Sequence, residues 1–173
     1  MRVVLFRHAP AETRDPDRWP DDAERPLTSR GAKRAKRVAA GIRALEPALV
    51  RVLSSPAVRA RETALALTAA IGEDARLETL APLGPDGSWR QHLGVLMSLA
   101  EEDPAATIAL VGHEPDLGKL AGALLFGAPT PMPLKKAGAC AIGLDHPAVG
   151  AGTLLWWCPP RALRALARRR RGS

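Results

Sequence analysis

The stretch Arg2-Val3-Val4-Leu5-Phe6-Arg7-His8 decides the fold class of this chain. Its run of four apolar residues is typical of a strand that is buried on both faces of a parallel sheet. The charged pair Arg7-His8 follows the run directly. In such sheets, ligands bind outside the carboxyl ends of the strands. The stretch therefore predicts a buried strand with ionisable residues at the end where a site would form.

Similar apolar runs recur along the chain and alternate with segments of helical spacing. Further strands are predicted at residues 49–53, 77–80, 107–111, 140–144 and 153–157. Helices are predicted after Thr28 to about residue 45, over 58–71, 89–100 and 116–126, and after Pro159-Pro160. This alternation predicts an α/β fold, a single-domain three-layer sandwich whose mostly parallel sheet has helices on both faces. Residues 10–26 are polar and proline-rich, which favours a long surface loop of functional importance.

The arginines are concentrated near the end of the chain. The net charge is +7, and six arginines lie in the last thirteen residues, which leaves about +1 on the rest. We expect a domain over residues 1–160 and a basic tail over 161–173 that is solvated and partly disordered. Weak binding of the tail to polyanions is the alternative.

Composition excludes several classes of protein. Hydrophobic residues make up 46% and charged residues 25% of the chain, which is typical of a globular protein. No apolar run approaches the ~20 residues that a membrane helix needs, and the first apolar run is too short for a secretory signal, so we expect a cytoplasmic protein without membrane contact. Two cysteines cannot form a disulfide framework. No phosphate-binding glycine loop or dinucleotide motif is present, and no aromatic residues interleave with the basic runs, so we expect no cofactor and no specific nucleic acid.

Three predicted strand ends carry cationic or ionisable side chains. The first strand gives Arg7-His8, the second leads through Ser54-Ser55-Pro56 to Arg59, and the strand at 107–111 is followed by His113. A single histidine or arginine at such a position is usually structural. Because parallel strands bring their carboxyl ends to one edge of the sheet, we expect these four side chains to converge there.

These residues resemble the motifs of the histidine phosphatases, the phosphoglycerate mutase-like superfamily. The resemblance spans about residues 2–126 and rests on four segments: Leu5-Phe6-Arg7-His8-Ala9, Arg25-Pro26-Leu27-Thr28 with Gly31, Ser54-Ser55-Pro56 through Arg59-Ala60 to Thr63, and Val111-Gly112-His113. The short chain and the Arg-Pro-Leu-Thr segment are most similar to the small SixA-type phosphohistidine phosphatases.

The resemblance implies a metal-independent phosphatase that works through a phosphohistidine intermediate. His8 would be the nucleophile, Arg7 and Arg59 would bind the phosphoryl oxygens, and His113 would donate a hydrogen bond to them. A neutral imidazole is a suitable nucleophile near pH 7, since its ordinary pKa is about 6.5. Arginine suits the oxygens because its planar fork is always charged.

The sequence departs from the family pattern in two places. Ala9 stands where the first motif usually has glycine, which would matter only if the backbone there needed a positive φ. The stretch Leu80-Ala81-Pro82 lacks the glutamate that many relatives use as general acid. Glu78, Asp86 and Glu114 are weak substitutes, and each is expected to be a surface residue. Since an imidazole leaves far more readily than an alkoxide, the missing acid favours phosphohistidine in a protein as the substrate.

Two other functions stay open from the sequence. One is a broad-specificity phosphomonoesterase that acts on small phosphorylated molecules, and the other is a phosphate-binding module without catalysis. Neither His92, in a predicted helix, nor His146, in a predicted turn, matches a family motif, and both are expected to be structural. The physiological substrate, the oligomeric state and the role of the arginines near the C-terminus are not decided by the sequence.

Overall fold

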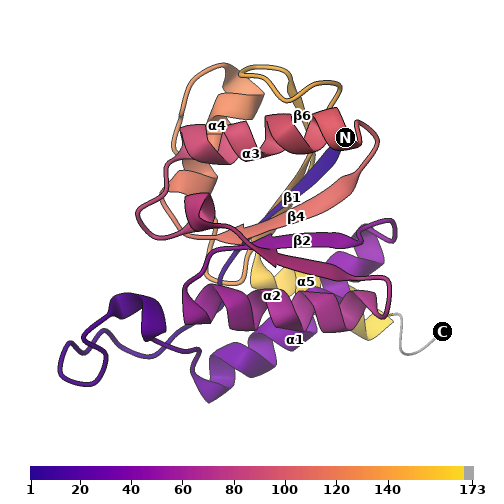
Figure 1. The fold of residues 1–173 in the computed structure, drawn as a ribbon. Helices are drawn as coiled ribbons and strands as arrows, with labels where there is room; N and C mark the ends of the chain where they lie inside the picture. Colours follow the sequence, from indigo (N-terminus) through magenta and orange to yellow (C-terminus); the bar gives the residue numbers. More distant parts are fainter. Residues whose placement is uncertain (170–173) are drawn as a thin grey trace.

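The computed structural model describes residues 1–169, which form a six-stranded sheet between two layers of helices (Figure 1). The strands are β1 (Arg2–Arg7), β2 (Arg51–Ser54), β3 (Arg76–Thr79), β4 (Thr107–Gly112), β5 (Ala139–Leu144) and β6 (Gly152–Cys158). Their order is β3-β2-β4-β1-β5-β6. The first four run parallel, whereas β5 and β6 are antiparallel to their neighbours. The predicted mostly parallel α/β sandwich is thus confirmed.

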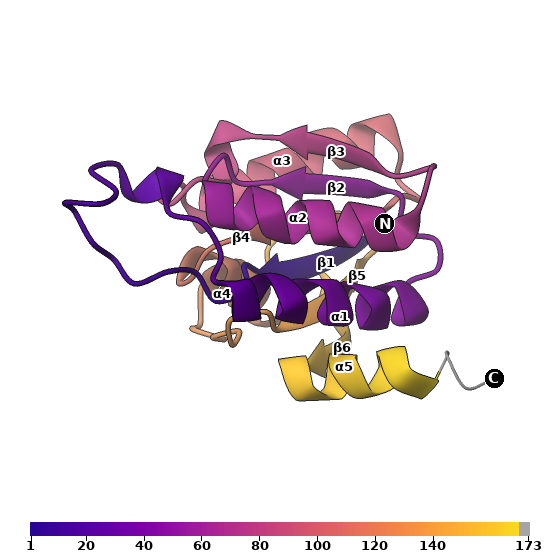
Figure 2. The same cartoon turned by 90° about the horizontal axis from the view of Figure 1, so that it is seen from below.

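Helices cover both faces of the sheet (Figures 1 and 2). One layer contains α1 (Ser29–Leu45), α2 (Val58–Ile71) and α5 (Pro160–Arg169), and the other contains α3 (Trp89–Glu102) and α4 (Asp116–Phe126). Strand β1 lies between the two cores because its side chains alternate. Val4 and Phe6 belong to the core under the first layer, and Val3 and Leu5 to the core under the second. This double burial explains why the strand is an unbroken apolar run.

The start of α1 fixes the end of the long loop. Thr28 caps the helix, since its Oγ1 accepts a hydrogen bond from the N–H of Gly31 at 2.9 Å. A Cβ atom on Gly31 would lie 1.9 Å from the carbonyl oxygen of Pro10, so only glycine allows this close approach. The loop over residues 10–28, which contains the short helix η1 (Asp22–Glu24), is therefore anchored against α1 at both of its ends.

Residues 161–169 of the expected basic tail form most of α5, the helix predicted after Pro159-Pro160, and this part of the tail is packed rather than solvated throughout. Leu163 is fully buried in the core under α1, and its carbonyl oxygen lies so close to α1 that a Cβ on Gly41 would stand only 2.0 Å away. Arg161 and Arg168 are exposed on the other faces of this amphipathic helix. Basic composition alone suggested a solvated tail, but the apolar stripe decides the packing. Residues 170–173 of the expected tail lie outside the described residues.

Leu163→Ala tests this packing directly. We expect the substitution to lower the free energy of unfolding by about 2–5 kcal/mol, because it leaves a cavity between α5 and α1. Urea denaturation monitored by circular dichroism measures the change, with Arg161→Ala, at an exposed position of the same helix, as control. An unchanged midpoint for Leu163→Ala would mean that α5 is not part of the cooperative unit.

No helix within residues 1–169 is long and apolar enough to cross a membrane. Both cysteines are free thiols: Cys140 is buried in β5 and Cys158 is partly buried in β6.

Candidate active site

All four residues expected at the site line one cavity of about 260 Å³. Its lining residues are Arg7, His8, Arg25, Arg59, Pro85, His113, Glu114 and Lys136. The centroids of the His8 and His113 rings are 5.0 Å apart, with the ring planes inclined at 54°. The cavity is therefore small, strongly cationic and bordered by two adjacent imidazoles.

The sheet register brings the two histidines together. In the parallel pair β1 and β4, Arg7 lies opposite Gly112, and the N–H of His8 donates to the carbonyl oxygen of Gly112 at 3.1 Å. His8 and His113 thus leave neighbouring strands at the same level. Arg59 lies in the first turn of α2, just beyond β2, which pairs with the other side of β4. Strand order therefore brings together residues that are more than 100 positions apart in sequence.

The spacing of Arg59 and Thr63 has a structural consequence. Thr63 lies one helical turn after Arg59, and its hydroxyl donates to the Arg59 carbonyl at 2.7 Å. The same hydroxyl oxygen accepts the N–H of Ala9 at 3.0 Å. Thr63 thus connects α2 to the backbone immediately after His8. The motif at 54–63 therefore holds the backbone after His8 in addition to placing Arg59 at the cavity.

The ring of His8 is oriented by a backbone carbonyl. Its Nδ1 lies 2.8 Å from the carbonyl oxygen of Ala9, which can only accept a hydrogen bond. Nδ1 therefore carries the proton of the neutral ring, and Nε2 keeps a free electron pair. This is the tautomer that a nucleophilic histidine requires. His8 is 7% exposed, so the ring is shielded but reachable.

His113 is held by a hydroxyl group. Its Nε2 lies 2.8 Å from the Oγ of Ser55, and that oxygen already accepts the N–H of Ala57 at 3.2 Å. The Ser55 hydroxyl can donate to Nε2, an arrangement in which the proton of the neutral His113 ring lies on Nδ1. Ser55 belongs to the motif at 54–63, but nothing in that motif indicated that it contacts this ring.

Both imidazoles are held neutral by their surroundings. Burial lowers the pKa of His8 to about 4; the hydrogen bond to Ala9 opposes the shift, and the charges of Arg59 and Arg7 add to it. Burial lowers the pKa of His113 to about 3, and the proximity of His8 adds to that shift. Near pH 7 the cavity therefore contains two neutral rings among permanent guanidinium charges.

These shifts predict a stability that declines in acid. In the unfolded protein the His8 ring is protonated below its ordinary pKa of about 6.5, whereas in the folded protein it is protonated only below about pH 4. The free energy of unfolding should therefore fall as the pH decreases from 6.5 towards 4. His8→Asn should reduce this fall by roughly 2 kcal/mol between pH 7 and pH 5. Urea denaturation at both pH values measures it, and His146→Asn, at an exposed position, is the matched control. An equal decrease in the free energy of unfolding for His8→Asn and His146→Asn would contradict the lowered pKa of His8.

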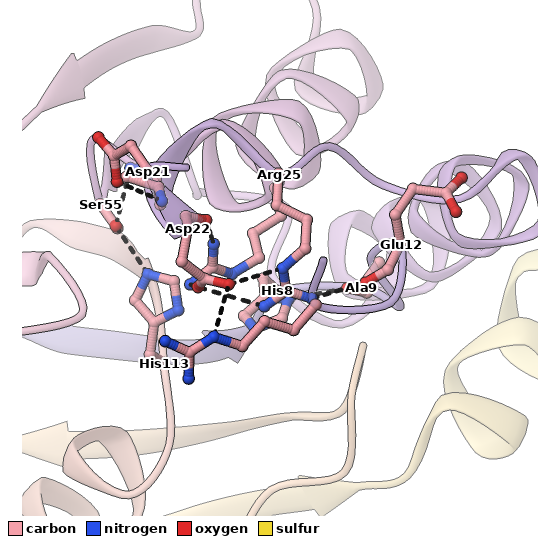
Figure 3. Close-up of polar contacts among 12 residues, drawn as sticks. His8, Ala9, Glu12, Asp21, Asp22, Arg25, Ser55 and His113 are labelled. Carbon is pink, nitrogen blue, oxygen red and sulfur yellow. Dashed lines mark hydrogen bonds and ion pairs between the residues drawn. The ribbon is translucent and has the colours of Figure 1, made fainter. Parts of the chain in front are cut away.

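Arg59 is fixed by the long loop rather than by its own helix. Its Nη1 donates to the carbonyl oxygen of Asp22 at 2.6 Å, and its Nη2 lies 3.1 Å from the carboxylate of the same residue. The carboxylate also accepts the Nε of Arg25 at 2.9 Å, as Figure 3 shows. Hydrogen bonding from Arg25, with the charge of Arg59 adding to it, lowers the pKa of the Asp22 carboxyl. Asp22 therefore joins two of the arginines that line the cavity, a role that the sequence analysis missed.

Of the three weak candidates for a general acid, only Glu114 lines the cavity. Glu78 pairs instead with Arg51, at 2.7 Å, and Asp86 is exposed outside the lining. The expectation that Glu114 is a surface residue is wrong, because it is half-buried beside His113. Arg25 and Lys136 also line the cavity and were not named as site residues. Arg25 was visible in the Arg-Pro-Leu-Thr motif, whereas nothing near Lys136 in the sequence pointed to the site.

The remaining sequence predictions concern single residues. Ala137 is the one non-glycine residue with positive φ within residues 1–169, so Ala9 does not need the conformation that would demand glycine. His92, on α3, is buried at 1% exposure and does not line the cavity. His146 is exposed. Within the same residues no group of three histidine, cysteine or acidic side chains is close enough to hold a metal ion.

Comparisons with known proteins agree with this geometry. Residues 3–83 match the model of the histidine phosphatase superfamily (branch 1). A relative from Picosynechococcus, described as an uncharacterized protein, is 39% identical over 141 residues, which cover 80% of this chain and 82% of the relative. The chain belongs to the histidine phosphatase superfamily. Among histidine phosphatases it is similar to the phosphohistidine phosphatase SixA of Escherichia coli K12, with 29% identity over 95% of this chain and 97% of SixA.

The structural comparison points to the same branch of the histidine phosphatases. A structure of the protein histidine phosphatase SixA in complex with tungstate has a TM-score of 0.81 and 28% identity, and the match covers 94% of this chain and 99% of that one. The fold and family together support phosphatase activity on phosphorylated substrates.

Proposed function

We propose that this protein hydrolyses phosphohistidine in a protein through a covalent intermediate on His8. The observation that carries the proposal is the free Nε2 of His8 in a cavity shared with Arg7, Arg59 and His113. In the first step, Nε2 bonds to phosphorus as the bond between phosphorus and the substrate imidazole breaks, and that imidazole takes a proton from solvent. In the second step, water attacks phosphorus, the bond to His8 breaks, and inorganic phosphate leaves.

Two buried donors support the binding of a phosphoryl group. The Nε atoms of Arg7 and Arg59 are buried and have no hydrogen-bond partner within residues 1–169. An unsatisfied buried donor costs about 1–3 kcal/mol, and more when it is charged. A phosphoryl oxygen in the cavity would supply the missing acceptors. The guanidinium charges would also stabilise the charge that develops on the oxygens during transfer. The proposal therefore requires no metal ion.

The second imidazole has a complementary role in the proposal. In this proposal the Ser55 hydroxyl donates to Nε2 of His113, so the proton of the neutral ring lies on Nδ1 and the contact to Ser55 fixes the orientation of the ring. It would donate to a phosphoryl oxygen without competing with His8 for the phosphorus atom. A donor that is already oriented needs no rearrangement during the reaction, which lowers the barrier.

The scarcity of carboxyl groups in the cavity favours cleavage of a P–N bond. Glu114 is the one carboxylate that lines the cavity among residues 1–169, and it accepts the N–H of Leu134 at 2.8 Å. A positioned acid contributes roughly 10²- to 10⁴-fold when the leaving group is poor. An alkoxide needs that help, whereas an imidazole, whose conjugate acid has a pKa of about 6.5, leaves readily without it.

Matched peptides test the preference. We expect kcat/KM for a phosphohistidine peptide to exceed that for the same peptide with phosphoserine by at least roughly 10²-fold, the contribution of one missing acid. Release of inorganic phosphate at pH 8, where phosphohistidine is stable, measures both substrates. A higher value for phosphoserine, or for a small sugar phosphate, would replace the proposal with a phosphomonoesterase function.

A further inference from the structure

The guanidinium of Arg7 is held by the segment that joins α4 to β5. Its Nη1 donates to the carbonyl oxygen of Leu134 at 2.7 Å. The N–H of the same residue donates to Oε1 of Glu114 at 2.8 Å. Glu114 directly follows His113 and lines the cavity. The backbone of Leu134 therefore links the carboxylate of Glu114 to the guanidinium of Arg7.

This segment is fixed at further points. The side chain of Leu134 is 1% exposed and packs in the core beneath α3 and α4. The N–H of Ala137 lies within hydrogen-bond distance of two carbonyl oxygens at the end of β1, at 3.2 Å from that of Arg7 and 3.1 Å from that of His8, the residue after the strand. The carbonyl group that holds Arg7 thus belongs to a backbone segment that is anchored at the site. The hydrogen bond from the N–H of Leu134 to Glu114 connects this segment to the turn between β4 and α4.

The helix provides room for the carboxylate. A Cβ atom on Gly118 would lie 2.7 Å from Oε2 of Glu114 and 2.6 Å from the carbonyl oxygen of Met132. Because α4 has a glycine there, the carboxylate and the segment before Leu134 can both lie against the helix. The second carboxylate oxygen is therefore enclosed between the helix and the loop. That enclosure orients Oε1 towards the N–H of Leu134.

The environment of Glu114 suits an acceptor better than a proton donor. Burial raises the pKa of its carboxyl, but the hydrogen bond from Leu134 and the charge of Arg7 favour the ionised form. Burial lowers the pKa of the Arg7 guanidinium, and the charge of Glu114 opposes that shift. A general acid must carry a proton aimed at the leaving group. Oε1 accepts the N–H of Leu134 and Oε2 lies against the backbone of Gly118, so backbone groups engage both oxygens of the carboxylate.

We propose that Glu114 is a positioning residue that fixes Arg7 through the backbone of Leu134, and that it delivers no proton to the leaving group. The inference rests on the proposed phosphatase function, since Arg7 matters there as a ligand of the phosphoryl group. It explains how a carboxylate beside the motif histidine serves the site without replacing the glutamate that many relatives have after the third strand.

Two substitutions separate positioning from proton transfer. Glu114→Gln keeps an oxygen that accepts from Leu134, so kcat/KM should stay within about threefold of wild type. Glu114→Ala removes the acceptor, so the affinity for inorganic phosphate and tungstate should fall about tenfold, the effect of one lost hydrogen bond to a charged network. KM should rise more than kcat falls. Asp103→Ala is the control. It removes a side-chain-to-backbone hydrogen bond just before β4, at the end of that strand away from the site, and should change neither kcat/KM nor the affinity for anions.

A double-mutant cycle identifies Arg7 as the residue through which Glu114 acts. In an Arg7→Ala background, Glu114→Ala should cause no further loss of tungstate affinity. Equal losses in both backgrounds would overturn the proposal. A loss of kcat in Glu114→Gln of 10²-fold or more, with the basic limb of the pH profile removed, would show proton transfer instead. This Gln variant decides between the two roles even if Glu114→Ala does not fold. Anion binding by calorimetry remains informative if the protein hydrolyses no phosphohistidine, so the two proposals can fail separately.

Discussion

We expect His8→Asn to lower kcat by roughly 10³- to 10⁶-fold, the range seen when a catalytic nucleophile is removed. Asparagine is close to histidine in size and leaves the strand end filled. It has no ring nitrogen with a free electron pair at the position of Nε2, which faces the cavity because Nδ1 is bound to Ala9. Phosphate binding should survive in part, since Arg7, Arg59 and His113 are unchanged.

Covalent labelling measures this effect more directly than turnover. Wild-type protein mixed with a radiolabelled phosphoryl donor and quenched in base should retain label, because phosphohistidine survives base and is hydrolysed in acid. His8→Asn should retain none, and His146→Asn should label like wild type. Label on the His8→Asn variant would place the nucleophile elsewhere. Wild-type protein that binds phosphate but neither labels nor turns over would be a binding module without catalysis.

Arg59 should give the second-largest effect. Arg59→Ala removes a charged donor beside the phosphoryl site, and we expect kcat/KM to fall by roughly 10²- to 10³-fold, as for the loss of one preorganised oxyanion donor. Arg59→Lys should restore little of this. One face of the guanidinium binds the carbonyl and the carboxylate of Asp22, while Nε remains free for an oxygen of the substrate. A lysine ammonium is a compact point charge that cannot span both sets of partners.

The control for Arg59 lies on the same helix. Arg61 is exposed on α2, so Arg61→Ala should leave kcat/KM unchanged while it removes the same charge from nearly the same place. Steady-state kinetics with the phosphohistidine peptide, together with calorimetric titration of tungstate, separate loss of binding from loss of catalysis. Near-wild-type kinetics in Arg59→Lys would show that charge alone is needed and that the contacts to Asp22 do not orient the site.

Much of the fold and of the site could be predicted because the signals are local. The helix expected over residues 58–71 is α2 with the same bounds, since its apolar spacing is local and Pro56 and Gly72 stand just outside its two ends. His8 and His113 could be predicted because each directly follows a buried strand, and the ends of parallel strands share one edge. The partners of these residues could not be predicted in the same way. Asp22 binds Arg59 from 37 positions away, and Leu134 binds Arg7 from 127 positions away.

For the C-terminal segment from residue 161, a local property of the sequence suggested a different environment from the one in the folded chain. Its arginines dominate the composition, and composition favoured a solvated segment. The burial of Leu163 against α1 depends on a surface of α1 that exists only in the folded chain, where Gly41 allows the two helices to approach closely. Glu114 was likewise assigned to the surface because its neighbours in sequence do not reveal the segment that returns over it.

The amino-acid pattern alone determined the α/β class, the positions of its strands and helices, and the four cationic or imidazole side chains at the strand ends. These follow from apolar periodicity and from residues adjacent to it, which are short-range properties. Only the tertiary structure decided which nitrogen of His8 is free, which groups hold Arg7 and Arg59, and whether α5 packs against α1. Those outcomes depend on contacts between segments that the order β3-β2-β4-β1-β5-β6 brings together, and no local pattern specifies that order.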